Sequence, residues 1–277
     1  MFQTVDGRKI AGEKFSELKR KIEKEQLSLS LAVVKVGKDE TSQIYVNAKK
    51  RELEKVGISV SIYYFPEDVS EEELCKEIKL LKEDGVIVQL PLPVNLNKQK
   101  ILDTVLEKKD VDLLSTTSLG KFYKGTNKIN PPVVGAVKSI LDYYRVEYRE
   151  KNIVLVGSGM LVGKPLSVFF MESKNTVSVL NSRTNDIGYF TRKADIIVSG
   201  AGVPRLIKGD MIKDGAVVID AGTSTEKGVL MGDVDIESVK EKASLVSPVP
   251  GGVGPLTVYH LAENLVRLNT PPSLRGR

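Results

Sequence analysis

The sequence is poor in the residues that build disulfides and metal sites. Among 277 residues it has one cysteine (Cys75), one histidine (His260) and no tryptophan. A single cysteine cannot form an intramolecular disulfide and excludes a cysteine-rich metal site. His260 lies in a predicted amphipathic helix, where a packing or surface role is the ordinary one. We therefore expect no metal, and a chemistry that depends on Lys, Tyr, Asp, Gln or a bound cofactor.

Long apolar segments are also missing. No apolar run is long enough to span a bilayer, and residues 1–7 lack the basic and apolar regions of a signal peptide. We expect a cytoplasmic protein with no membrane partner, and the single cysteine fits a reducing compartment. Lys and Arg exceed Asp and Glu by 41 − 36 = 5. These charges are spread along predicted helix faces, as in residues 13–20, which indicates solvated surfaces and no nucleic-acid partner.

Strand-like and helix-like segments alternate along the chain in two series. The predicted strands of the first series are 29–36, 58–65 and 86–90, and its helices are 9–24, 41–56 and 70–82. The strands of the second series are 152–156, 176–180, 195–199 and 216–220, and its helices are 161–172 and 255–268. Such alternation predicts βαβ units and mostly parallel sheets. The polar stretch 121–130, in a loop that extends to about residue 134, is the expected boundary between two α/β domains.

A glycine turn follows the first strand of the second series. Gly157, Gly159 and Gly163 have the spacing G-x-G-x-x-x-G between a strand and a helix. Such a turn lets backbone amides and a helix N-terminus approach a pyrophosphate. A purely structural glycine turn is the alternative. The next strand ends without a carboxylate, and Ser182 and Arg183 follow it, so the sequence favours NADP over NAD. A solvent-facing Arg183 is the alternative there.

A second rigid loop stands just before the C-terminal helix. Residues 247–257 contain Pro248, Pro250 and Pro255 with Gly251, Gly252 and Gly254. Prolines fix φ and glycines permit positive φ, so the loop can present backbone amides at a helix N-terminus.

Polar residues that could perform chemistry lie in the first series. Tyr45 and Lys49 are four residues apart in a predicted helix and share one face with Ser42. Gln89 ends a buried strand, and ligands bind at the carboxyl ends of strands in open α/β sheets. Asp112 could add a carboxylate at the same edge, although a turn-stabilising Asp is the alternative.

These segments together resemble the bifunctional methylenetetrahydrofolate dehydrogenase/cyclohydrolase family. Residues 248–257 are similar to its signature P-V-P-G-G-V-G-P-M-T, and residues 88–93 match its V-Q-L-P-L-P. The pattern Ser42-x-x-Tyr45-x-x-x-Lys49, the opening residues 5–11 and the segment 232–235 also fit. The resemblance covers nearly the whole chain in order.

The resemblance implies two α/β domains with parallel sheets, the second a Rossmann-like dinucleotide-binding domain, and an active site in the cleft between them. Residues 1–124 would form the folate-binding catalytic domain, with helix 255–277 packing back on it, and 125–254 the NADP-binding domain. The enzyme would oxidise 5,10-methylenetetrahydrofolate with NADP, or else NAD, and hydrolyse the product to 10-formyltetrahydrofolate. It would act as a homodimer in one-carbon metabolism and purine biosynthesis.

The resemblance also assigns roles. Lys49 would be the catalytic lysine, Gln89 would tune it, Tyr45 would stack on the folate, and Asp112 would bind the pterin edge. The remaining substrate-binding residues would be Leu90, Pro91, Pro250, Gly251 and Gly252. The cofactor-binding residues would be Gly157, Ser158, Gly159, Gly163, Ser182, Arg183, Thr184 and Gly252.

The sequence departs from the family pattern at several positions. Ser158 replaces the usual Arg of the cofactor turn, Leu113 replaces a Gly after Asp112, and Ser118 replaces an Asn. Segment 131–136 lacks the usual Cys and Thr. Two other functions are open alternatives: another Rossmann-type NAD(P) dehydrogenase, and a non-catalytic folate- or nucleotide-binding protein.

Overall fold

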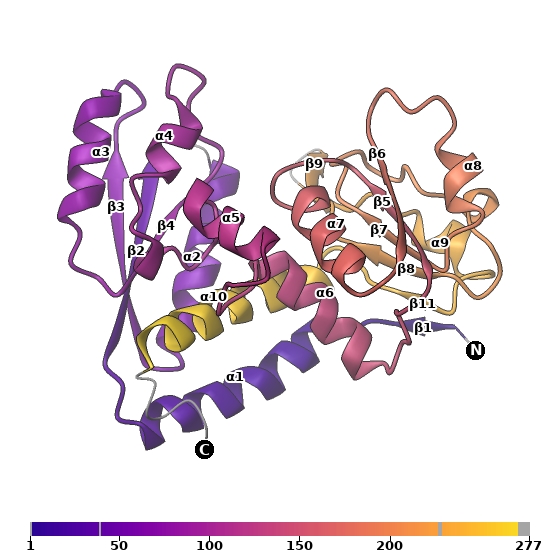
Figure 1. Ribbon diagram of the computed structural model, residues 1–277, viewed down its shortest axis with the longest axis horizontal. Helices are drawn as coiled ribbons and strands as arrows, with labels where there is room; N and C mark the ends of the chain where they lie inside the picture. Colours follow the sequence, from indigo (N-terminus) through magenta and orange to yellow (C-terminus); the bar gives the residue numbers. More distant parts are fainter. Residues whose placement is uncertain (1, 39, 227–228, 271–277) are drawn as a thin grey trace. The chain divides into compact units, whose positions relative to one another are not determined.

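The computed structural model describes residues 2–38, 40–226 and 229–270, and their side chains except those of 40–42, 44 and 45. The chain divides into two compact units. The six-stranded unit comprises Met1–Glu13 and Pro132–Thr257, and the three-stranded unit comprises Lys14–Pro131 and Val258–Arg277. Both are α/β, as predicted (Figure 1). The predicted division at residue 124, which concerns ligand binding, stays a prediction.

The sheet of the three-stranded unit is entirely parallel. Strand β2 (Leu29–Val36) lies between β3 (Ile58–Phe65) and β4 (Gly85–Val88). All but one of the β2 residues are buried. A strand with both faces covered requires such a nearly continuous apolar run.

Helices α1 (Gly7–Lys24), α2 (Glu40–Glu54), α3 (Glu71–Leu80) and α10 (Val253–Asn269) supply most of the remaining core. Leu18, Leu53 and Leu265 join Leu31 in one apolar cluster that includes residues from α1, α2, α10 and the sheet. Helix α3 begins as predicted, because the Ser70 side chain accepts a hydrogen bond from the Glu73 amide at 3.2 Å. Shorter helices complete the unit: α4 (Lys98–Leu102), the 3-10 turn η1 (Glu107–Lys109) and α5 (Thr116–Tyr123).

The sheet of the six-stranded unit is also parallel, with the order β1-β11-β8-β7-β5-β6. Its strands are β1 (Gln3–Thr4), β5 (Asn152–Val156), β6 (Thr176–Leu180), β7 (Ile196–Ser199), β8 (Val217–Asp220) and β11 (Leu245–Val246). The chain continues from β5 to β6 on one side and then returns to β7 on the other side. This reversal is a topological switch point, where open parallel sheets bind ligands.

Helices α6 (Pro132–Tyr143), α7 (Gly163–Glu172), α8 (Ile187–Thr191) and α9 (Ile236–Val239) belong to the same unit, with the 3-10 turn η2 (Gly209–Met211). Helix α7 contacts β5 and β6. An antiparallel hairpin, β9 (Ser224–Glu226) and β10 (Val229–Met231), follows β8.

Two expectations about local structure were wrong. The predicted loop 121–134 is shorter, because α5 reaches Tyr123 and α6 begins at Pro132. The Ser115 side chain caps α5 by accepting from the Ser118 amide at 3.2 Å, and a proline suits a first helical position. The helix predicted from residue 161 begins at Gly163, because the glycine turn continues to Val162. The predicted tail 271–277 lies outside the described residues.

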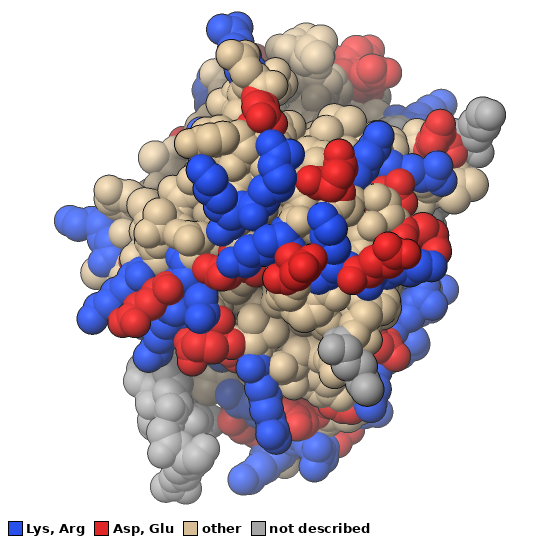
Figure 2. Space-filling model, turned by 90° about the vertical axis from the view of Figure 1, so that its right-hand side faces the viewer, with Lys and Arg blue, Asp and Glu red and all other residues tan. Residues whose placement is uncertain are grey.

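The charged side chains are dispersed. Lys and Arg lie beside Asp and Glu over much of the face in Figure 2. Exposed ion pairs such as Lys138–Asp142 and Lys19–Glu23 join residues one helical turn apart, as expected for solvated helix faces. Among the described residues, no helix has the length and apolar character needed to cross a membrane.

Candidate active site

Lys49 and Gln89 meet at the carboxyl end of β4. Lys49 lies on α2, and its Nζ donates a hydrogen bond to Gln89 Oε1 at 2.9 Å. The Gln89 amide nitrogen donates to the Leu90 carbonyl at 2.8 Å. Because this second bond fixes the amide group, the Gln89 carbonyl oxygen is directed at the lysine. The sequence predicted both residues, and the structure brings them together.

Asp112 lies on a tight loop that a buried neighbour organises. Asp110 is 3% exposed, and its carboxylate accepts from the Leu114 amide at 3.2 Å and the Ser115 amide at 3.0 Å. Asp110 also forms a parallel bridge with Val86 of β4. Leu113 has φ +53 and is fully buried. The loop therefore holds Asp112 near β4, the strand that Gln89 follows.

The electrostatics of Lys49 and Asp112 are coupled. Burial lowers the pKa of Lys49 from its ordinary value of 10.5, and the charge of Asp112 opposes this change. Burial raises the pKa of Asp112 from 3.8 to about 6, against the effect of Lys49 and together with that of Asp110. Since desolvation disfavours both charged forms, Lys49 is more readily neutral than an exposed lysine. A neutral amine can accept a proton.

Three other predicted site residues, Tyr45, Leu90 and Pro91, lie close to Lys49 or Gln89 in the chain. Tyr45 belongs to α2, but its side chain and that of Ser42 lie outside the described part of the structure. Leu90 is half-buried and Pro91 is exposed, and a cis peptide bond joins them.

The glycine turn lies at the switch point of the six-stranded sheet. Gly157 has φ +111, and a Cβ there would meet the Gly200 carbonyl oxygen at 2.5 Å. A Cβ on Gly163 would lie 1.9 Å from the Gly157 oxygen. Both glycines are therefore required by the fold. Ser158 and Gly159 are exposed, and a Cβ on Gly159 would meet nothing within 4 Å.

The turn after β6 lies next to this glycine turn. The Gly157 amide donates to the Leu180 carbonyl at 3.0 Å. Asn181 Oδ1 accepts from the Arg183 amide at 2.9 Å, and Thr184 Oγ1 accepts from the Asn181 amide at 3.1 Å. Ser182 and Arg183 are exposed. The structure thus brings the predicted cofactor residues of two adjacent strand ends together.

The third predicted cofactor element is the proline- and glycine-rich loop. Gly251 has φ +108, the Gly252 amide donates to the Pro248 carbonyl at 2.9 Å, and Val249–Pro250 is cis. A Cβ on Gly7 would overlap the Gly252 oxygen at 1.8 Å. The loop is packed tightly against the start of α1 within the six-stranded unit.

Comparison with known proteins identifies the fold. Residues 5–112 match the family model "Tetrahydrofolate dehydrogenase/cyclohydrolase, catalytic domain", and residues 131–271 match the family's "NAD(P)-binding domain". This chain belongs to the tetrahydrofolate dehydrogenase/cyclohydrolase family. The resemblance stated from the sequence is confirmed.

Two curated relatives support the assignment to this family. The bifunctional protein FolD of Lactobacillus delbrueckii subsp. bulgaricus is 40% identical over 275 residues, covering 97% of each chain. The FolD protein of Aquifex aeolicus is 41% identical over 272 residues, covering 95% of this chain and 94% of its own.

Solved structures support the same family assignment. The FolD methylenetetrahydrofolate dehydrogenase/cyclohydrolase of Campylobacter jejuni has a TM-score of 0.92 and 34% identity, covering 97% of this chain and 98% of its own. The Trypanosoma brucei enzyme, complexed with NADP and an inhibitor, has a TM-score of 0.92 and 32% identity, covering 96% of this chain and 97% of its own.

The six-stranded unit fits the dinucleotide of this family. Gly157 and Gly163 leave only backbone at the start of α7, so amides can approach a pyrophosphate there. Asp186, the nearest carboxylate after β6 in sequence, accepts from the Tyr189 amide at 3.0 Å and pairs with Arg192 at 3.5 Å. It acts as the N-cap of α8.

The sequence does not reveal the structural role of Asp233. The motif 232–235 resembles that of the family, but nothing in its spacing indicates that Asp233 is fully buried or that it binds the loop after β7. The G-D-V-D pattern was the only available signal.

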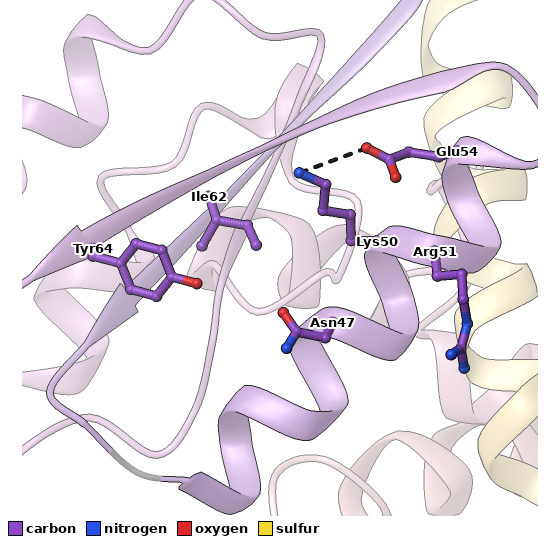
Figure 3. A pocket seen from close by; sticks show the side chains of 6 residues that line it. All are labelled: Asn47, Lys50, Arg51, Glu54, Ile62 and Tyr64. Carbon is purple, nitrogen blue, oxygen red and sulfur yellow. Dashed lines mark ion pairs between the residues drawn. The ribbon is translucent and has the colours of Figure 1, made fainter.

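A separate hollow of about 560 Å³ opens between α2 and β3 (Figure 3). Asn47, Lys50, Arg51, Glu54, Ile62 and Tyr64 line it. Lys50 pairs with Glu54 at 3.6 Å. None of the predicted site residues lines this hollow, so it is not the candidate active site.

Proposed function

We propose that this chain oxidises 5,10-methylenetetrahydrofolate to 5,10-methenyltetrahydrofolate with NADP⁺ and hydrolyses the product to 10-formyltetrahydrofolate. The observation that carries the proposal is the desolvated Lys49 bonded to Gln89 beside Asp112, in a chain whose family has both activities. We assign folate binding to residues of the three-stranded unit and NADP binding to the six-stranded unit.

For the hydrolytic step, Lys49 is the proton acceptor. Water attacks the methenyl carbon, and the neutral amine of Lys49 removes a proton from that water. The bond from this carbon to N5 then breaks, N5 receives the proton of the new hydroxyl group, and the formyl group stays on N10. Gln89 holds the lysine amine in place through its carbonyl oxygen. Overall, one water is consumed and one proton is released.

For substrate binding, Asp112 offers an acceptor pair to the amino-pyrimidine edge of the pterin, which presents two parallel donors. Its raised pKa has a consequence: a protonated Asp112 loses part of its acceptor capacity, so folate should bind more weakly below about pH 6. Tyr45 stacks on the folate, and Leu90, Pro91, Pro250 and Gly251 contact it.

For the oxidative step, a bound NADP⁺ would supply the hydride acceptor for the methylene carbon, so no side-chain base would be needed. Gly157, Ser158, Gly159, Gly163 and Gly252 supply backbone to the dinucleotide. Ser182, Arg183 and Thr184 bind the 2′-phosphate. Because the fold leaves open space beside Gly159, only the approach of a ligand would require glycine at that position.

The test supplies purified protein with methylenetetrahydrofolate and NADP⁺ or NAD⁺, and follows methenyl absorbance and NAD(P)H formation. We expect product with NADP⁺ and a lower rate with NAD⁺. Tight binding of folate or NADP⁺ without turnover would instead establish a non-catalytic binding protein.

We also propose that the protein is a cytoplasmic homodimer. Sedimentation equilibrium would check the oligomeric state, and cell fractionation would check the compartment.

A further inference from the structure

A buried carboxylate binds the end of β7 and the loop that follows it in the six-stranded sheet. Asp233 is fully buried, and its Oδ2 accepts from the Ser199 hydroxyl at 2.7 Å and from the Ala201 amide at 2.7 Å. The Gly202 amide reaches the same oxygen at 3.3 Å, and Oδ1 accepts from the Val203 amide at 2.8 Å. One side chain therefore satisfies three consecutive amides of the loop that follows β7.

The backbone on both sides of Asp233 holds the same loop. The Arg205 amide donates to the Gly232 carbonyl at 3.1 Å, and the Ile207 amide donates to the Asp233 carbonyl at 2.9 Å. The loop from Gly200 to Arg205 is thus bonded at its start by the carboxylate and at its end by the main chain. Its amides 201–203 face inward, while residues 202–205 are exposed.

Asp220 extends the arrangement to the next two strands. Its Oδ2 accepts from the Val234 amide at 2.9 Å, and its own amide donates to the Ser247 hydroxyl at 2.7 Å. A Cβ on Gly222 would meet the Asp233 carboxylate at 2.1 Å. Ser199, Asp220 and Ser247 stand at the ends of β7, β8 and β11, so the carboxylates of Asp220 and Asp233, together with the Asp220 amide, connect the ends of three neighbouring strands.

This cluster borders the switch point. The Gly200 carbonyl oxygen lies 2.5 Å from the position that a Cβ on Gly157 would take. The loop after β7 and the glycine turn after β5 are therefore in direct contact. Ligands of open parallel sheets bind between two such strand ends. A shift of the loop after β7 would change the surface offered to the dinucleotide.

We infer that Asp233 is a positioning residue for NADP binding, which fixes the loop 200–205 against the glycine turn of β5. The inference rests on the proposed function. It predicts that the identity of residue 233 affects binding of the dinucleotide and not the hydrolysis of methenyltetrahydrofolate, because only the dehydrogenase step uses NADP.

The main test is Asp233→Asn. Asparagine has nearly the same shape, but either orientation of its amide places an NH₂ group against at least one inward backbone N–H. We expect the Kd for NADP⁺, measured by calorimetry, and the dehydrogenase KM for NADP⁺ to rise roughly tenfold. Hydrolysis of supplied methenyltetrahydrofolate should stay within about twofold of wild type. Amide hydrogen exchange at residues 201–203 should become faster.

Asp195→Asn is the matched control. Asp195 also accepts from a backbone amide, that of Asn152 at 2.8 Å, and pairs with Lys213 at 2.5 Å, but it precedes β7 at the opposite end of the sheet. The Kd of the Asp195→Asn variant for NADP⁺ should stay within about twofold of wild type. An equal rise in both variants would attribute the effect to general loss of stability and overturn the inference.

Ser199→Ala decides the matter if Asp233→Asn does not fold. It removes one donor to the carboxylate and should raise the Kd for NADP⁺ roughly threefold. An unchanged Kd in the variants that fold would overturn the positioning role while the proposed function stands. Absence of NADP⁺ binding by the wild-type protein would instead contradict the proposed function itself.

Discussion

Lys49 Nζ donates a hydrogen bond to Gln89 Oε1 at 2.9 Å, although the two residues are forty positions apart in the chain. This bond gives the desolvated amine a neutral acceptor, and not a second carboxylate in addition to that of Asp112. A carboxylate would stabilise the ammonium form. The choice of glutamine therefore preserves the lowered pKa of Lys49 that burial produces.

Gln89→Glu should shift the pH dependence of hydrolysis. The new carboxylate would raise the pKa of Lys49, so less neutral amine would be present at a given pH. We expect the rising limb of the cyclohydrolase pH–rate profile to move upward by about one pH unit or more. Gln43→Glu adds the same charge to α2 at a side chain bonded to Asn47 and Tyr64, and it should leave the limb in place. An unmoved limb in Gln89→Glu would contradict the role of Lys49 as a proton acceptor.

Lys49→Ala should lose hydrolysis of supplied methenyltetrahydrofolate by roughly 10²–10⁴-fold, after correction for the spontaneous reaction. Lys50→Ala is the neighbouring control. Lys50 forms a surface pair with Glu54 at 3.6 Å, and such pairs contribute little. If Lys49→Ala keeps the wild-type rate, another group performs the proton transfer.

Arg183→Ala should reduce the preference for NADP⁺ over NAD⁺. Arg183 is exposed on the turn after β6, where no carboxylate is free to bind a ribose hydroxyl in its place. We expect kcat/KM with NADP⁺ to fall about tenfold or more while that with NAD⁺ changes little. Lys193→Ala removes an exposed cation that lies over the Tyr189 ring just beyond α8, and it should not change the ratio. Equal losses with both cofactors in Arg183→Ala would exclude a role in 2′-phosphate recognition.

Leu113→Gly should destabilise the protein although it removes an unfavourable backbone angle. Relief of the left-handed conformation would return about 1 kcal/mol. Loss of a fully buried leucine side chain should cost about 3–5 kcal/mol, so the free energy of unfolding should fall by about 2–4 kcal/mol. Arg145→Gly is the control, since Arg145 has φ +54 but is exposed. Urea unfolding should show it unchanged or slightly stabilised. A stabilised Leu113→Gly would mean that backbone strain outweighs packing at this loop.

Asp220→Asn should flatten the dependence of stability on pH. Burial raises the pKa of Asp220 from 3.8 to about 6, so the folded state binds the proton more strongly than the unfolded state does. The stability from this proton is fully present below pH 3.8 and is lost as pH rises through 6. The loss should reach about 2.4 kcal/mol between pH 4 and 7, and the asparagine variant should lack it. Parallel urea-derived curves for both proteins would contradict this assignment.

The sequence predicted the long strands of the fold well. The strands 29–36, 58–65, 152–156 and 176–180 were predicted with the bounds that the structure has, because β-branched apolar runs end there at turn residues. Helices α4, α8 and α9 escaped prediction, since four or five residues show no helical period. Each instead begins at an Asn or Asp that accepts a backbone hydrogen bond.

The candidate site was predictable as a set of residues and not as a geometry. Lys49, Gln89 and Asp112 could be named from motifs, yet the direction of the Gln89 amide depends on its bond to the Leu90 carbonyl. The buried state of Asp233 depends on contacts about thirty positions away in the chain. No local pattern encodes such contacts, because they arise only when the strand ends are assembled.

Each compact unit is formed by two separate segments of the chain, and this constrains folding during synthesis on the ribosome. β1, formed by Gln3 and Thr4, pairs with β11, formed by Leu245 and Val246. Leu261 and Leu265 of α10 belong to the same apolar cluster as Leu31. The nascent chain therefore completes neither unit until nearly its whole length has been made. Its early segments must wait for late partners, so premature termination would leave two incomplete cores and not one finished half.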